Sequence, residues 1–195
     1  SQAGRLGFRW DDAIVLQPNA ALLGWSLAFR AFAMLDKGEL FAVFRPFSTW
    51  EGVIGLLAPL AVGATSIIHS GSLGEVLDAA NHERLGGIWL DWAQAEALAS
   101  DLRVRQRRGQ WKWVYISVDS SFSVRKRRRL GRMLGSQILT VLGTPATGPI
   151  AGSPRTWLID EAVGTPTTGV DLFPVDSPGG RLADAPWPRL ASASV

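Results

Sequence analysis

Short apolar runs alternate with helix-like segments along most of this chain. Apolar runs of strand length occupy residues 41–44, 65–69, 87–90, 113–118 and 138–142. The segments between them repeat apolar residues at helical spacing, as Val53, Leu56 and Leu60 do within residues 51–62. Strands that alternate with helices build parallel sheets with right-handed crossovers, and continuously apolar strands indicate a sheet covered on both faces. We therefore predict an α/β protein with a mostly parallel sheet flanked by helices.

Capping residues mark the boundaries of several predicted helices. We predict helices over residues 20–35, 51–62, 72–84, 92–102 and 123–134. Ser72 and Glu75 have the spacing of a capping box, which predicts the start of the third helix. Asp91 suits the N-cap of the fourth helix, and Gly135 suits the C-cap of the fifth. Pro59 lies inside the second helix, where it removes a backbone donor and predicts a kink.

The sequence changes character after Gly143, where Pro and Gly become frequent and helical spacing ends. Short strands are predicted over residues 155–160 and 170–175, and they would form a small β-rich C-terminal appendage. Residues 177–195 contain three prolines and are predicted to be irregular. The predicted organisation is a parallel α/β subdomain over 1–150, a short β segment over 151–176 and a tail over 177–195.

Composition excludes several kinds of site. The chain has no cysteine, which rules out disulfides and thiol chemistry, and its two histidines, His69 and His82, lack a metal-ligand spacing. Residues 52–74 carry no charged side chain. Pro59 and Gly63 interrupt this run, and its uninterrupted part is shorter than the ~20 residues of a spanning helix. We therefore predict a cytoplasmic protein without a membrane span and without a metal site.

Two basic segments, residues 103–113 and 125–132, hold most of the positive charge in a chain of formal net charge +3. Arginine clusters near tryptophan can bind phosphates and stack on bases, so nucleic-acid binding is one hypothesis. No nucleic-acid-binding motif accompanies the charge. The outer helices of α/β domains are normally charged on their solvent side, and this interpretation is favoured.

The residues that follow the predicted strands are site candidates by position, because ligands of open α/β sheets bind beyond the carboxyl ends of the strands. Residues 143–148 form a turn rich in Gly, Thr and Pro, and residues 116–123 carry several hydroxyl groups. Their N–H groups and hydroxyls could bind a phosphate or a carbonyl. Trp50 and Trp92 begin helices at the same predicted edge and could line an apolar pocket.

The order of these segments resembles the central stretch of the adenylate-forming ligases, which include acyl-CoA synthetases, fatty-acyl-AMP ligases and adenylation domains. Residues 44–68, FRPFSTWEGVIGLLAPLAVGATSII, are similar to a family segment in which a helix ends in Pro-Leu and leads through Gly-Ala to a strand. Residues 161–176, EAVGTPTTGVDLFPVD, are similar to its Gly-x-Val-Gly-x-Pro…Gly-Val-x-x-x-Val-Asp segment. The resemblance implies one central subdomain of a longer fold that uses ATP and Mg²⁺.

The turn at residues 142–146 departs from the family pattern. The family's aromatic-Gly-x-Thr-Glu signature falls here on Leu142, Gly143, Thr144, Pro145 and Ala146. In the family, the Thr contacts the α-phosphate and the Glu holds Mg²⁺. Proline has neither a hydroxyl nor an N–H, and alanine has no carboxylate. Groups that offset developing phosphate charge are therefore missing from this turn.

Other functional positions of the family also hold different residues. Thr49 stands where the family usually has a His near the acyl pocket. Residues 117–121, SVDSS, stand where a Gly-Gly-Ala-Pro-type turn would line the adenine. The family's Lys-bearing phosphate loop has one candidate here, residues 1–9, which contain Gly4 and Gly7 but no Lys.

These replacements predict a degenerate, non-catalytic ligase-like domain, a pseudoenzyme whose motifs do not support ATP or Mg²⁺. It would bind a protein partner or a second copy, or a small acyl or nucleotide-like molecule, and the family's sister subdomain implies an exposed apolar face. The predicted ligand-contact residues are Thr49, Trp50, Ser117, Val118, Asp119, Ser120, Leu142, Gly143, Thr144, Pro145 and Ala146. The alternatives are a component of an AMP-forming acyl-CoA or acyl-AMP ligase and a basic nucleic-acid-binding domain.

Overall fold

The structure is a computed structural model, and it describes residues 4–10, 12–68, 72, 74, 85–102, 104, 111–119, 122–160, 162–168 and 170–171. The strands are β1 (Arg5–Trp10), β2 (Ala13–Pro18), β3 (Leu40–Val43), β4 (Thr65–Ile68), β5 (Leu85–Leu90), β6 (Trp113–Ser117), β7 (Gln137–Thr144), β8 (Gly148–Gly152) and β9 (Thr165–Pro166). The helices are α1 (Asn19–Ala33), α2 (Trp50–Leu60), α4 (Trp92–Ser100) and α6 (Val124–Leu134).

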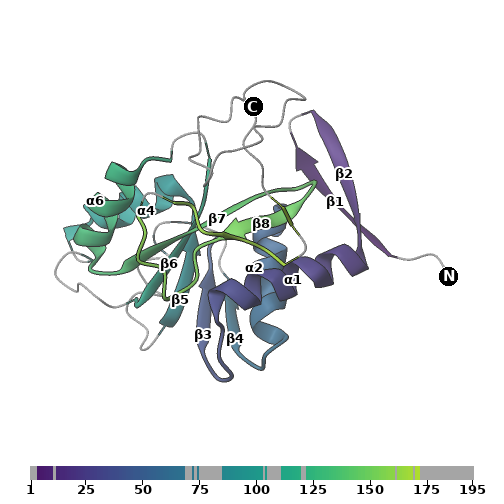
Figure 1. Cartoon of the computed structure of the whole chain (residues 1–195), viewed down its shortest axis with the longest axis horizontal. Helices are drawn as coiled ribbons and strands as arrows, with labels where there is room; N and C mark the ends of the chain where they lie inside the picture. Colours follow the sequence, from purple (N-terminus) through teal and green to yellow (C-terminus); the bar gives the residue numbers. More distant parts are fainter. Residues whose placement is uncertain are drawn as a thin grey trace.

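One sheet organises the molecule, with the strand order β4-β3-β5-β6-β7-β8-β9 (Figure 1). The first five strands in this order pair in parallel, which confirms the predicted α/β fold and all five predicted strand positions. β8 and β9 continue the sheet in antiparallel pairing. β1 and β2 form a separate antiparallel hairpin, which lies to one side of the sheet in Figure 1.

Both faces of the sheet are buried under helices. Successive strand residues point to opposite faces, so on β5 the Trp89 side chain packs with α1 and α2. Ile88 and Leu90 pack on the other side with α4 and α6. The continuously apolar strands predicted this two-sided burial.

An aromatic cluster fills the side of the sheet that α1 covers. Phe29 of α1 is fully buried and stacks on Trp89, with 4.4 Å between the ring centroids. Its ring also makes edge-on contacts with Phe32, Phe41 and Tyr115, at centroid distances of 5.2, 5.8 and 5.5 Å. The cluster therefore joins α1 to three neighbouring strands, β3, β5 and β6.

A buried polar cluster lies among these aromatic side chains. The Tyr115 hydroxyl donates to the Ala33 carbonyl oxygen at 3.0 Å and accepts from Arg155 Nε at 3.2 Å. Arg155 also forms an ion pair with Glu39, and both side chains are only 10% exposed. Burial raises the pKa of the Tyr115 hydroxyl well above its ordinary value. These contacts fix the segment after β8 to the amino end of the sheet.

Most predicted helix boundaries are confirmed. Asp91 and Gln94 form a capping box at the start of α4, and Gly135 ends α6 in the left-handed region with φ 65°. The fifth helix begins one residue later than predicted, because Ser123 is its N-cap and accepts from Lys126 N at 3.2 Å. The predicted helix over 72–84 lies almost entirely outside the described residues.

Pro59 lies in the last turn of α2, which ends at Leu60. A proline leaves the carbonyl four residues earlier without its helical donor. The Ser66 hydroxyl lies within hydrogen-bond distance of the Gly55 and Leu56 carbonyl oxygens, at 3.4 and 3.1 Å. In the part of the chain that the structure describes, no helix has both the length and the apolarity that a membrane span requires.

The predicted strand over residues 155–160 is wrong. These residues form turns and irregular backbone, and side chains rather than a neighbouring strand satisfy several of their carbonyl groups. Gln137 Nε2 donates to the Trp157 carbonyl at 2.6 Å, and Arg127 Nη1 lies 3.4 Å from the Asp160 carbonyl. The apolar residues of this segment therefore belong to a packed loop and not to a strand. Of the predicted strand over 170–175, residues 170 and 171 are not in a strand, and the rest lies outside the described residues.

Candidate functional site

The carboxyl ends of β3, β5, β6 and β7 meet at one edge of the sheet, because these strands run in parallel. Three predicted ligand-contact residues gather there around Trp89. The Trp89 Nε1 group donates to Ser117 Oγ at 3.1 Å, and Trp50 packs edge-on against Trp89 with 5.9 Å between centroids. A Cβ added at Gly143 would lie 2.8 Å from the Trp50 ring. Ligand contact by these residues stays a prediction.

The turn between β7 and β8 forms hydrogen bonds within itself. The Thr144 N–H donates to Thr147 Oγ1 at 3.2 Å, and the N–H groups of Ala146 and Thr147 lie 3.2 Å from Thr144 Oγ1. The two hydroxyls are 2.9 Å apart. Pro145 has no N–H. Within residues 144–147, the three backbone N–H groups present therefore all donate to a neighbouring hydroxyl.

Side chains from the N-terminal part of the chain pack against this turn. Gln17 of β2 donates through Nε2 to the carbonyl oxygens of Pro145 and Ala146, at 3.1 and 3.0 Å. Trp25 of α1 lies so close to Gly148 that a Cβ there would overlap its ring. Gly148 also has φ 65°, a region that favours glycine. The space beside the turn is therefore occupied by Gln17, Trp25 and Trp50.

The other predicted site residues have structural contacts. Thr49 is the N-cap of α2, where its hydroxyl accepts from Gly52 N at 3.2 Å and donates to the Pro46 carbonyl at 2.7 Å. Val118 N donates to the Val141 carbonyl at 2.7 Å and extends the pairing of β6 with β7. Asp119 is exposed, and Ser120 lies outside the described residues. Trp92, a predicted pocket wall, is buried 6.0 Å from the Phe122 ring.

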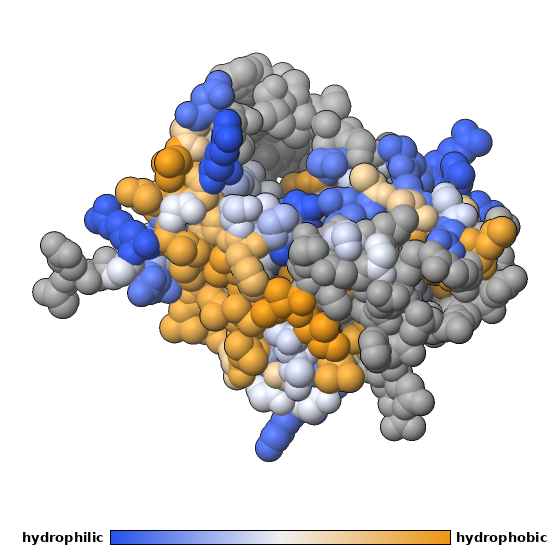
Figure 2. Space-filling model, turned by 180° about the vertical axis from the view of Figure 1, so that it is seen from behind, coloured by the Kyte–Doolittle hydropathy of each residue, from blue (hydrophilic) through white to orange (hydrophobic). Residues whose placement is uncertain are grey.

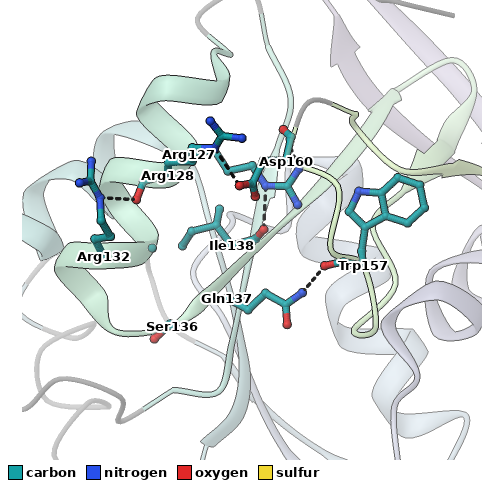
Figure 3. Close-up of a pocket in the computed structure, with 9 residues that line it drawn as sticks. Arg127, Arg128, Arg132, Ser136, Gln137, Ile138, Trp157 and Asp160 are labelled. Carbon is teal, nitrogen blue, oxygen red and sulfur yellow. Dashed lines mark hydrogen bonds and ion pairs between the residues drawn. The ribbon is translucent and has the colours of Figure 1, made fainter.

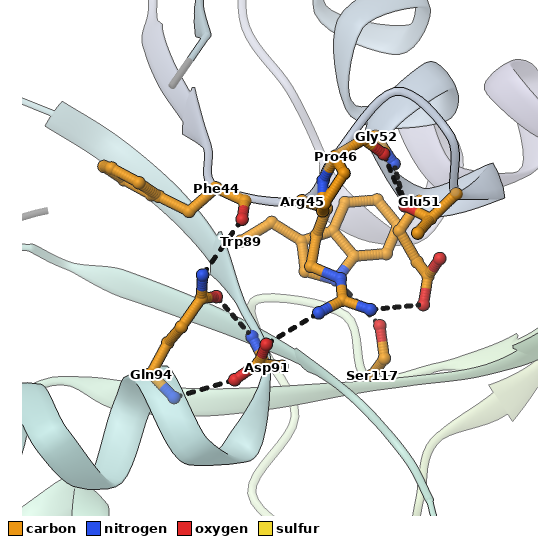
Figure 4. Close-up of polar contacts among 10 residues, drawn as sticks. Phe44, Arg45, Pro46, Glu51, Gly52, Trp89, Asp91, Gln94 and Ser117 are labelled. Carbon is orange, nitrogen blue, oxygen red and sulfur yellow. Dashed lines mark hydrogen bonds and ion pairs between the residues drawn. The ribbon is translucent and has the colours of Figure 1, made fainter. Parts of the chain in front are cut away.

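Sequence patterns did not reveal an ion-pair cluster centred on Arg45, which follows β3 (Figure 4). Arg45 Nη1 lies 2.8 Å from Asp91 Oδ2, and Nη2 lies 3.5 Å from Glu51 Oε1. Gln94 Nε2 donates to the Phe44 carbonyl at 3.1 Å, which ties α4 to the end of β3. A charged residue directly after an apolar strand was the available signal, but its partner at 2.8 Å, Asp91, lies 46 residues away in sequence.

The candidate phosphate loop, residues 1–9, is not a loop in the part that the structure describes. Residues from Arg5 onward form β1, and Phe8 is buried and packs near Trp25, with 6.2 Å between ring centroids. Gly7 faces the Ile14 and Leu16 side chains across the hairpin. The alternating pattern of a hairpin strand explains this segment better than a phosphate cradle does.

Mg²⁺, which the resemblance implies together with ATP, finds few suitable ligands among the described residues at this edge. Mg²⁺ needs oxygen ligands, usually carboxylates and phosphates. The turn over 144–147 offers no carboxylate, and the neighbouring acids Glu51 and Asp91 are paired with Arg45. The described residues contain no group of three His, Cys, Asp or Glu that could hold a metal ion.

No family model and no curated protein matches the chain. Solved structures do match its fold. MatB from Rhodopseudomonas palustris with ATP bound gives a TM-score of 0.77 at 15% identity over 91% of this chain. The anthranilate CoA ligase AuaEII in complex with anthranoyl-AMP gives 0.77 at 14% identity over 93%. The amide bond synthetase Mcba from Marinactinospora thermotolerans gives 0.73 at 20% identity over 88%.

These similarities establish the fold. The chain has the α/β fold found in part of these ligases, as the order of its segments predicted. It covers 36% of the length of each of the three matched chains.

Proposed function

We propose that the chain is a non-catalytic protein-interaction module with the ligase fold, and that it pairs with a second copy through the outer face of α1. The observation that carries the loss of catalysis is the turn over 144–147, where neighbouring hydroxyls accept the backbone N–H groups. Phosphoryl chemistry depends on groups that neutralise developing charge. Pro145 and Ala146 supply none at the position where the resemblance implies them.

An apolar surface on α1 supports the interaction role. We call this surface the α1 stripe; it consists of the exposed residues Ala20, Leu23, Gly24, Leu27, Ala31 and Met34. Its three large side chains are 59%, 45% and 46% exposed, and a Cβ at Gly24 would meet nothing within 4 Å. Figure 2, which shows the molecule from behind, has further hydrophobic residues over the half that carries the hairpin and α2. Such surfaces mark interaction sites in soluble proteins.

The α1 stripe is complementary to itself in an antiparallel arrangement about a two-fold axis through Leu27. In that arrangement, Leu23 would face the partner's Ala31, and Met34 would face the partner's Ala20. Leu23 and Met34 would then each meet a small side chain, and Leu27 would meet the partner's Leu27 on the axis. A two-fold interface uses the same patch on both subunits. We therefore propose a second copy of the chain as the partner.

A nucleotide titration tests the loss of catalysis. Isothermal calorimetry with ATP and Mg²⁺ is expected to give no saturable binding, because the turn has neither a free N–H nor a carboxylate for the phosphates. ATP–pyrophosphate exchange with a panel of carboxylic acids is expected to stay at the enzyme-free level. Saturable binding together with exchange would refute the proposal.

The same titration separates the proposal from the main alternative, a component of an AMP-forming ligase. That alternative is favoured by the matched structures, whose names include bound ATP and anthranoyl-AMP. It requires nucleotide contact at the carboxyl edge, so ATP should then protect this edge from hydrogen exchange. Absence of protection at residues 143–148 would count against it.

Sedimentation of the chain over a range of concentrations tests the pairing. The wild type is expected to form dimers, and Leu27→Lys is expected to weaken them. Loss of two buried leucines costs about 3 kcal/mol or more, which is roughly a hundredfold in the dissociation constant. The matched control is Leu158→Lys, because Leu158 is 89% exposed and lies on a different segment. A chain that stays monomeric at every concentration, or equal effects of the two variants, would contradict the pairing.

A further inference from the structure

A groove of about 510 Å³ lies between α6, the start of β7 and the loop at residues 157–160 (Figure 3). Arg128, Gly131 and Arg132 line it from α6, and Gln137, Trp157 and Asp160 line it from the other side. Gln137 begins β7, whereas the turn over 144–147 follows the other end of that strand. The groove is therefore separate from the carboxyl-edge site described above.

A buried arginine gives this groove a defined shape. Arg127 is only 3% exposed, and its Nε donates to the Ile138 carbonyl at 3.0 Å. Its Nη1 donates to the Ala162 carbonyl at 2.9 Å, so the guanidinium joins α6 to the loop on the far side. The loop is thus held against the helix by directed contacts that satisfy buried carbonyl groups.

The positions of the charged side chains on α6 destabilise the helix. Arg125, Lys126 and Arg127 lie in its first turn, where the helix dipole favours acidic groups. Arg128 and Arg132 are four residues apart, a spacing at which like charges repel. The helix contains no acidic residue. A bound anion between Arg128 and Arg132 would offset the repulsion between these two side chains.

One carboxylate already contacts the first of these two arginines. Asp160 Oδ2 lies 2.9 Å from Arg128 Nε, and the two side chains are 43% and 52% exposed. An ion pair this exposed is weak, so a stronger anion can replace it. Arg132 lies one turn along the helix, and its Nε contacts the Arg128 carbonyl at 3.4 Å. Figure 3 shows both arginines on α6 and Asp160 on the facing loop.

We propose that this groove binds a small organic phosphate, with the phosphate or pyrophosphate group held by Arg128 and Arg132 in place of Asp160. The volume is that of a small-molecule site. Guanidinium groups bind phosphate oxygens through two parallel hydrogen bonds, which makes arginine well suited to this ligand. Ile138 and Trp157 supply an apolar wall for the organic part.

Pyrophosphate is the probe for the test, with calorimetry and thermal denaturation of the full chain at constant ionic strength. Pyrophosphate is expected to bind saturably and to raise the melting temperature above that in sodium chloride. Arg132→Ala should weaken binding roughly tenfold or more, because it removes a charge-assisted hydrogen bond. Arg129→Ala is the matched control, since Arg129 is exposed on the same helix but does not line the groove.

Asp160→Asn gives a readout of opposite sign. It removes the competing carboxylate, so pyrophosphate should bind about two- to fivefold more tightly. A purely structural role of Asp160 would predict the reverse. Equal losses in the Arg132 and Arg129 variants would overturn the proposal. An absence of saturable pyrophosphate binding would also overturn it, and steeply salt-dependent binding of oligonucleotides would then support a nucleic-acid surface instead.

Discussion

Arg155→Met is expected to lower the free energy of unfolding by about 3–5 kcal/mol, because it leaves the Glu39 carboxylate buried without its partner. Both side chains are 10% exposed in the ion pair. Methionine keeps much of the apolar stem but loses the guanidinium that lies over the Trp113 ring, 5.4 Å from its centroid, so the loss is mainly electrostatic. The variant also removes the hydrogen bond that Arg155 Nε donates to the Tyr115 hydroxyl. Denaturant unfolding followed by tryptophan fluorescence measures the effect.

A double variant separates the unpaired charge from lost packing. Glu39→Gln combined with Arg155→Met removes both charges, and it should recover a large part of the stability lost in the single variant. If the double variant is as unstable as Arg155→Met alone, the unpaired carboxylate is not the cause. A loss below about 1 kcal/mol in the single variant, the range of exposed pairs, would also contradict the burial argument.

Phe29→Ala is expected to cost about 3–5 kcal/mol, the range of buried Phe-to-Ala substitutions. The phenyl ring is fully buried, and it contacts aromatic side chains of α1, β3, β5 and β6. Its removal opens a cavity between the α1 layer and the sheet, where stacked rings cannot collapse easily. Arg30→Ala on the same helix is the control, because Arg30 is exposed and lies outside the α1 stripe, so it should change stability by less than about 1 kcal/mol. Similar losses for both variants would mean that α1 does not pack as described.

The parallel part of the fold could be predicted because each strand carries its own signal. Residues 87–90 and 138–142 are apolar runs of strand length, and the helices between strands have capping residues such as Asp91 and Ser123. These signals are local, so one sequence suffices to read them. Parallel pairing followed from the alternation of strands and helices.

The antiparallel additions could not be predicted, because their strands depend on contacts elsewhere. β8 has the sequence GPIAG, whose glycines favour a turn when read alone. Gly148 and Gly152 are required there because Trp25 and Phe32 of α1 pack directly on them. Residues 155–160 show the converse case. Their apolar residues predicted a strand, but they form a loop whose carbonyl groups accept hydrogen bonds from side chains such as Arg127.

The predicted site residues could be assigned to one edge of the sheet, but their contacts could not be predicted. Strand ends and the turn over 142–146 lie at one edge of the sheet, because parallel strands present their carboxyl ends together. The ion pair of Arg45 with Asp91 was not predicted, since residues 46 positions apart carry no mutual signal in one sequence. The hydroxyl contacts of Thr144 and Thr147 also depend on turn geometry that composition does not determine.

The closed turn between β7 and β8 limits how an adenylating activity could be engineered into this scaffold. Ala146→Glu alone would supply a carboxylate, yet the amides of the turn would still be occupied by Thr144 and Thr147. Gln17 and Trp25 would continue to hold the loop from the hairpin side. A designer would have to rebuild the loop together with the segment that covers it. Such a redesign would therefore have to replace at least two segments that are distant in sequence, and both at the same time.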